Sequence, residues 1–161
     1  MAYGLDRFAR AAAPHLEPGE QIVGGTWART PGGFAAERAG GLVVGIAAQL
    51  GTAAAGALRL PKAFEVAVTD RRLLFFDRSP VTGRPRTLVA AVDLAAVAVA
   101  ELAASRHGVE HVAVRMRSGA TIDVEIAKLG ARTLAERFVA CVDAQLTEPR
   151  PAAPAPGRAR P

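Results

Sequence analysis

Apolar and polar positions alternate most clearly between Phe64 and Asp77, where a strand, a turn and a second strand follow one another. In Phe64–Thr69 every second residue is Phe or Val, which is the period of a half-buried β-strand. The run Leu73–Phe76 is apolar at every position and predicts a strand buried on both faces. Between them, Thr69–Arg72 predicts a turn in which Asp70 accepts hydrogen bonds from the N–H groups that follow it, while the two arginines stay in water. The stretch therefore predicts a β-hairpin.

Other segments carry weaker strand patterns. Gln21–Arg29 is expected to be a first strand, with Trp27 near its end as a packing residue, and Arg86–Val92 a later one. Residues 93–105 leave two alternatives open. Asp93 can cap an alanine-rich helix, whereas Val97 and Val99 fit a strand.

A second hairpin is predicted around the loop Ser118–Ala120. Both of its apolar sets face one core if Met116 pairs with Ile122 and Val114 pairs with Val124. That register also sets Arg115 beside Asp123 on the outer face, as a solvated salt bridge.

Helical spacing appears at both ends of the chain. Residues 3–13 predict a short N-terminal helix that Pro14 ends, and 131–146 carry the clearest helical pattern of the sequence and predict an amphipathic helix. One stripe of that last helix gathers Leu134, Phe138, Cys141, Val142 and Leu146. Residues 147–161 are a Pro/Ala/Arg tail with little to bury, which predicts disorder. The domain is therefore expected to span residues 1–146.

Residues 34–58 form an apolar, Gly/Ala-rich segment whose last eighteen residues, 41–58, contain no charge. A membrane span here would place the strands on its two sides on opposite faces of the bilayer, so a span is excluded if those strands share a sheet. We expect a helical insertion that docks on the domain, associates with another copy or lies on a membrane; a Gly/Ala-rich insertion without a fixed place is the alternative. Small residues line one side of this helix and would let two helices approach closely: Gly41, Gly45, Ala48, Thr52 and Ala55.

The motif Val68-Thr69-Asp70-Arg71-Arg72-Leu73, with the terminal amphipathic helix, resembles the bacterial PH-like domain family. The resemblance implies a mainly β fold, a bent antiparallel barrel capped by the C-terminal helix, and it favours a strand for residues 93–105. It also implies a binding module without enzymatic activity. PH-superfamily members that bind phosphoinositides carry a basic motif in the loop joining their first two strands. Here that connection is Gly/Ala-rich and apolar.

Composition narrows the chemistry further. The net charge of +5 comes almost entirely from arginine and is not concentrated as in nucleic-acid-binding proteins, so no nucleic-acid partner is expected. Cys141 is the single cysteine and lies on the apolar stripe of the last helix, which favours burial over catalysis. The histidines His15, His107 and His111 lack the spacing of metal ligands. We expect no enzyme, no cofactor and no metal.

The first residues lack the apolar core of a signal peptide, so a cytoplasmic location is expected. The first function hypothesis is a non-catalytic module that binds a protein partner, or another copy of itself, through the Gly/Ala-rich helix. The alternative is a peripheral membrane adaptor at the inner face of the membrane, contacting anionic lipid through that helix and a basic rim. The candidate rim residues are Arg71, Arg72, Arg84 and Arg86.

Overall fold

The computed structural model describes residues 5–31, 60–103, 105, 109–126 and 130–147. In these ranges seven strands form one antiparallel sheet, in the order β4-β3-β2-β1-β7-β6-β5. The strands are β1 (Ile22–Arg29), β2 (Ala63–Thr69), β3 (Arg72–Arg78), β4 (Pro85–Asp93), β5 (Val97–Leu102), β6 (Glu110–Met116) and β7 (Thr121–Ile126). The helices are α1 (Leu5–Ala12), α3 (Ala131–Thr147) and two 3-10 turns, η1 (Ala13–His15) and η2 (Leu94–Ala96). The predicted mainly β class with a C-terminal helix is confirmed.

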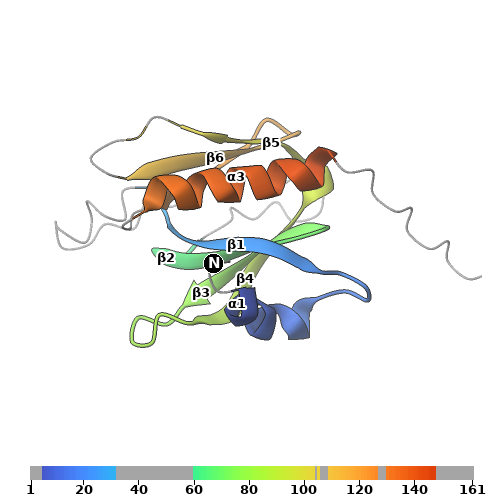
Figure 1. Cartoon of the computed structure of the whole chain (residues 1–161), viewed down its shortest axis with the longest axis vertical. Coiled ribbons are helices and arrows are strands. Elements are labelled where there is room, and N and C mark those ends of the chain that lie inside the picture. Colours follow the sequence, from blue (N-terminus) through green and yellow to red (C-terminus); the bar gives the residue numbers. More distant parts are fainter. Residues whose placement is uncertain (1–4, 32–59, 104, 106–108, 127–129, 148–161) are drawn as a thin grey trace, which may run out of the picture.

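The sheet folds over into two layers but does not close into a barrel. Strands β1 and β7 pair at Arg29 and Glu125 alone, so the β1–β4 half diverges from the β5–β7 half, and α3 lies across the opening (Figure 1). Strands β4 and β5 remain edges, and the register of each shifts at bulges. Bulges twist an edge away from further pairing. The predicted barrel closure is therefore wrong.

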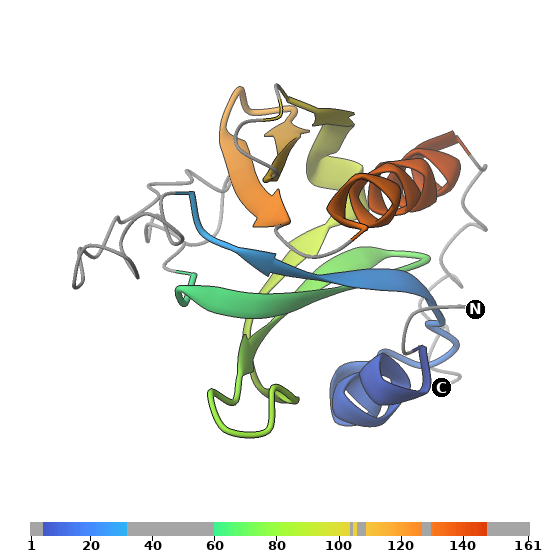
Figure 2. The same ribbon diagram turned by 60° about the vertical axis from the view of Figure 1, so that its left-hand side comes forward.

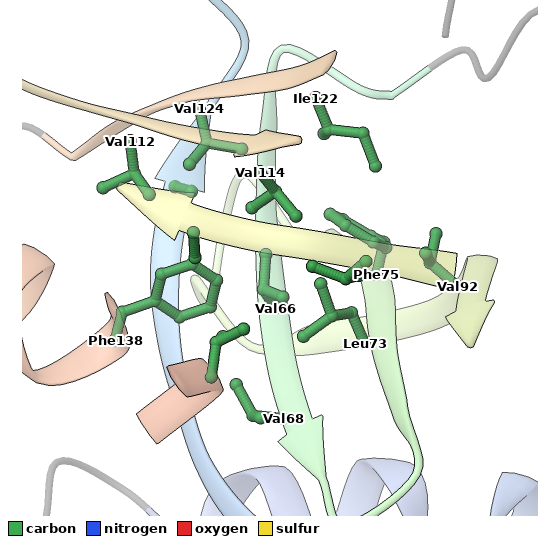
Figure 3. Packing of buried hydrophobic residues seen from close by; sticks show 14 of the residues in the cluster. Val66, Val68, Leu73, Phe75, Val92, Val112, Val114, Ile122, Val124 and Phe138 are labelled. Atoms are coloured by element: carbon green, nitrogen blue, oxygen red, sulfur yellow. The ribbon is translucent and has the colours of Figure 1, made fainter. Parts of the chain in front are cut away.

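The main core lies between the two layers and is built from aliphatic and aromatic side chains of both halves and of α3 (Figure 3). Phe138 and Val142 of α3 are buried in it, while Leu134, Cys141 and Leu146 of the predicted stripe lie half-buried at its margin. The packing is close: a Cβ on Gly24 of β1 would lie 2.5 Å from the Cys141 Sγ. Side chains labelled in Figure 3 are Val66, Val68, Leu73, Phe75, Val92, Val112, Val114, Ile122, Val124 and Phe138.

The helix α1 covers the outer face of the β1–β4 half. Phe8 and Ala12 of α1 pack on Ala67, Leu74 and Phe76 in a second apolar cluster. The run Leu73–Phe76 is therefore buried on both faces, as its sequence predicts, with Leu73 and Phe75 in the main core. The predicted hairpin is confirmed, since Phe64 pairs with Asp77 and Val68 with Leu73.

The register predicted for the second hairpin is wrong by two residues. Val114 pairs with Ile122, and Ala113 rather than Arg115 lies opposite Asp123. The loop closes early because Gly119 adopts a positive φ of 88° and its N–H donates to the Met116 carbonyl, as in a three-residue hairpin loop. The apolar sets still face the core, since a shift by two keeps every side chain on its face.

Residues 93–105 combine parts of both alternatives. The Asp93 carboxylate caps the short η2 turn by accepting from the Ala95 N–H, and the chain then continues as the strand β5. Arg115, predicted beside Asp123, forms its ion pair with Glu101 of β5 instead. The strand favoured by the family resemblance is confirmed.

The Gly/Ala-rich segment 34–58 and the tail beyond residue 147 lie outside the described residues. None of the helices in the described ranges combines the length and the apolar character needed to cross a membrane.

Candidate functional site

The β2–β3 turn, residues 69–72, is organised by Thr69 rather than by Asp70. The Thr69 Oγ1 accepts hydrogen bonds from the N–H groups of Arg71 and Arg72, at 3.1 and 2.7 Å. The Asp70 carboxylate instead accepts from the Gln21 N–H at 3.0 Å, and the Asp70 N–H donates to the Gln21 carbonyl. The role predicted for Asp70 is therefore wrong: it ties the turn to the chain that enters β1.

The buried Glu20 and the half-buried Arg72 form an ion pair beside this turn. The Glu20 carboxylate is fully buried and accepts from both Nε and Nη2 of Arg72, from the Thr69 hydroxyl and from the Glu17 N–H. A second Arg72 Nη2 contact reaches the His15 carbonyl at 3.0 Å. Arg72 therefore does not stay in water as predicted, and it joins the hairpin to the segment between α1 and β1.

The same contacts set the protonation state of Glu20. Burial by itself raises the pKa of Glu20, but the hydrogen bonds from Arg72, the Glu17 N–H and Thr69 outweigh it and lower the pKa from 4.5 to about 2. The pKa of Arg72 is raised in turn, chiefly by its hydrogen bond to Glu20. The pair is thus fully charged at neutral pH.

Arg71 is the more exposed arginine of the turn, with 40% of its side chain accessible. Its guanidinium lies 3.6 Å from the Glu17 carboxylate, which also reaches Arg72. Both cations of this turn therefore have an acidic partner.

The opposite end of β3 carries the β3–β4 loop, residues 79–84, which projects from the body away from α3 (Figure 2). Backbone bonds close it, from the Ser79 N–H to the Arg84 carbonyl and from the Gly83 N–H to the Ser79 carbonyl. Gly83 has a φ of 61°, and its carbonyl accepts from the Arg78 Nε at 3.1 Å. These bonds hold the loop in one shape.

A hollow of about 660 Å³ opens beside this loop. The ends of three strands meet there, because β1 and β3 both run toward this end while β2 starts from it. Its cationic side chains are Arg29, Lys62 and Arg78, its acidic wall residue is Asp77, and the remaining wall is formed by Pro61, Ala63 and the loop 79–83.

Trp27 fixes two of these arginines. The guanidinium carbons of Arg29 and Arg78 lie 5.1 and 5.0 Å from the centre of the indole ring, which is 7% exposed. Glu65, opposite Trp27 on β2, is also buried, with its carboxylate 3.7 Å from the Arg78 Nε. Trp27 is thus buried as predicted, and its ring packs against the guanidinium groups of Arg29 and Arg78.

Three exposed cations stand at this end of the sheet, and one of them, Lys62, also lines the hollow. Lys62, Arg84 and Arg86 are exposed, and none of them forms an ion pair with another residue in the described ranges. The compensating carboxylate of Glu65 is buried, and Asp77 is half-buried. The charges presented to solvent here are therefore mainly positive.

The predicted basic rim is divided by this arrangement. Arg71 and Arg72 lie at one end of β3, whereas Arg84 lies past its other end and Arg86 lies on β4 beside that end. The predicted helix-association stripe lies outside the described residues. Sequence reasoning missed Arg29, Lys62 and Arg78, although each stands at a strand end next to a Pro/Gly-rich break, and antiparallel order brings such ends together.

Neither a metal site nor a reactive cysteine is found in the described residues. Across those ranges no group of three or more His, Cys, Asp or Glu side chains is placed to hold a metal ion. Burial raises the pKa of the Cys141 thiol, which keeps it protonated and a weak nucleophile. Within the described residues, the hollow and the cations around it form the candidate ligand surface.

Comparison with known proteins gives one kind of match. The sequence matches no protein-family model and no curated protein. Among solved structures, the chain is similar to the crystal structure of a DUF1696 family protein with a pleckstrin-homology domain from Shewanella loihica PV-4. The two chains are 15% identical, and the match covers 84% of this chain and 92% of that chain with a TM-score of 0.42.

Proposed function

We propose that this protein is a non-catalytic binding module that attaches to anionic membrane surfaces through the end of the sheet around the hollow. The observation that carries the proposal is the set of three exposed cations without an ion-pair partner in the described ranges, Lys62, Arg84 and Arg86. Each lysine or arginine held near an anionic bilayer contributes about 1 kcal/mol to binding.

The connection between β1 and β2 also supports attachment through this end of the sheet. The described part of the chain stops at Pro31 and resumes at Leu60. Pro31 follows the end of β1, and Leu60 precedes the start of β2, and both of these strand ends lie at the hollow. Residues 41–58 of this connection contain no charge, and the described residues on either side of it, Pro31 and Leu60, stand two positions from Arg29 and Lys62. A bilayer surface offers anionic head groups and an apolar interior to these two features together.

The test compares two triple variants that remove the same charge. The first replaces Lys62, Arg84 and Arg86 with Gln, and the control replaces Arg10, Arg71 and Arg137, which are cations elsewhere on the molecule. Sedimentation with phosphatidylglycerol-containing vesicles should show a loss of affinity on the order of 100-fold for the first variant, because about 3 kcal/mol of attraction is removed. The affinity of the control should stay within about threefold of wild type, because salt largely screens charges that lie more than a Debye length from the bilayer.

An equal loss in both triple variants would mean that net charge alone drives attachment, and no binding by the wild-type protein would refute the function. Binding should also weaken as salt rises, because added ions screen exposed charges beyond about 10 Å at 0.1 M.

The hypothesis of self-association through the Gly/Ala-rich helix stays a prediction from the sequence. Replacing 34–58 with a Gly/Ser linker separates the two functions: a dimeric wild type and a monomeric variant, with neither bound to vesicles, would favour assembly. Vesicle binding weakened by the replacement, in a protein that is monomeric throughout, would favour the membrane function.

A further inference from the structure

Val81 is the most exposed large apolar side chain in the described residues, at 91%, and it stands at the tip of the β3–β4 loop. The other exposed valines lie on strands and are far less accessible, between 36% and 39%. Pro80 beside it is also exposed, so the tip presents two apolar residues side by side.

The loop that carries Val81 is held by its own hydrogen bonds. Besides the two backbone bonds that close it, the Ser79 Oγ accepts from the Thr82 N–H, and the Thr82 Oγ1 accepts from the Arg84 N–H. The Arg78 side chain, placed against Trp27, donates to the Gly83 carbonyl. An apolar residue on such a loop loses little conformational freedom when it enters a partner, which favours binding.

The position of the tip determines what it meets. Arg84 is the last residue of the loop and is exposed, and Val81 lines the same hollow as Lys62, Arg29 and Arg78. An apolar tip with cations beside it is complementary to an anionic bilayer, in which head-group charge lies above an apolar interior. A protein partner would have to combine acidic groups around an apolar pocket.

We propose that the β3–β4 loop is a membrane-inserting wedge, with Val81 entering the apolar boundary of an anionic bilayer while Lys62 and Arg84 contact the head groups. This inference rests on the membrane function proposed above and names the orientation of the domain on the surface. The β3–β4 loop points toward the bilayer, and the β2–β3 turn with its ion pairs points away from it.

The experiment changes the apolar area of the tip and leaves the charge constant. Val81→Ser should weaken binding to phosphatidylglycerol-containing vesicles about tenfold, and Val81→Leu should strengthen it about threefold, because affinity follows the apolar area removed from water. Val99→Ser, on β5 of the other half, is the matched control and should bind like wild type. Raising the salt should weaken all four proteins while the affinity ratio between the Val81→Leu and Val81→Ser variants stays the same, since insertion of an uncharged side chain is not screened.

A second readout reports the position of the tip directly. In a Cys141→Ala background, an environment-sensitive fluorophore on Val81→Cys should move to shorter emission wavelengths when vesicles are added, while the same label on Val99→Cys should not.

The outcomes separate the wedge from the membrane function itself. If wild type binds vesicles while Val81→Ser binds equally well and the label at position 81 stays in water, the wedge is refuted and the membrane function stands. If wild type does not bind vesicles at all, both are refuted. Graded affinities together with a shifted label at position 81 establish the wedge.

Discussion

The two ends of strand β3 both carry arginines, but they use them in opposite ways. At the β2–β3 turn, the half-buried Arg72 pairs with the buried Glu20, and Arg71 lies beside Glu17. At the β3–β4 loop, Arg84 is exposed and forms no ion pair within the described ranges. Removing the cation from a buried carboxylate destabilises the fold because the carboxylate is left without a counter-ion, whereas an exposed cation without a partner is available to a ligand. Position on the same strand therefore says little about role; the partner decides it.

The largest expected effect is on stability at the β2–β3 turn. Arg72→Met should lower the free energy of unfolding by about 3 kcal/mol, because the Glu20 carboxylate stays buried without its counter-ion. Arg84→Met, at the other end, should change it by less than about 0.5 kcal/mol, as for an exposed side chain. Urea denaturation of the two variants measures both values.

A double variant identifies the cause. Glu20→Gln with Arg72→Met removes both charges, so its loss should be clearly smaller than the sum of the two single losses. Additive losses would mean that the two side chains act independently, and would contradict the ion pair as the source of stability.

The pH dependence of stability should follow Glu20. Its pKa is about 2 in the folded protein and near 4.5 when unfolded, so the ionised carboxylate favours the folded state. The resulting stabilisation, up to about 3 kcal/mol, is complete above pH 5 and is lost as the pH falls toward 2. The difference in unfolding free energy between wild type and Glu20→Gln should therefore be largest near neutral pH and close on acidification. A difference independent of pH would contradict this assignment.

The hairpin between Phe64 and Asp77 could be predicted because alternation, a turn and a doubly apolar strand agree over consecutive residues. The register of β6 and β7 could not be predicted in this way, since a shift by two leaves Val114 and Ile122 facing the same core. Local pattern gives the face of a residue, and only the loop geometry at Gly119 selects its partner.

The roles of the arginines could not be predicted from the local sequence pattern for a related reason. Glu20 stands 52 residues before Arg72, so no spacing rule connects them, and the turn sequence alone suggests solvated arginines. The hollow likewise combines residues from the ends of β1, β2 and β3. The breaks after Arg29 and Arg78 are visible in the sequence, but the pairing order that brings them together is needed to make a site.

Substituting a glycine of positive φ at each end of β3 compares the two ends through the backbone. Gly83→Ala and Gly19→Ala should each cost about 1 kcal/mol of stability, because alanine disfavours φ near 61° and 78°. A Cβ at position 83 would also lie 2.7 Å from the Arg78 Nη2, whereas at position 19 its nearest such contact is at 3.8 Å. Gly83→Ala should therefore displace the Arg78 guanidinium from Trp27.

The single tryptophan makes this displacement measurable. Intrinsic fluorescence should change in Gly83→Ala and stay as in wild type in Gly19→Ala, although both lose similar stability. Identical spectra for the two variants would mean that the Arg78 contact with Trp27 does not depend on the loop.

The smallest effects are expected from replacing one surface arginine at each end of β3. One replacement should affect stability alone and the other vesicle binding alone. Arg71→Gln should lower stability by a few tenths of a kcal/mol, because its pair with Glu17 is exposed and screened, and should leave vesicle affinity unchanged. Arg84→Gln should leave stability unchanged and weaken vesicle binding about fivefold, close to the contribution of one cation at an anionic surface. Urea denaturation and vesicle sedimentation of the same two proteins measure both effects. Equal losses of vesicle affinity would mean that net charge, rather than the cations at one end of β3, drives attachment, and would contradict a single attachment surface.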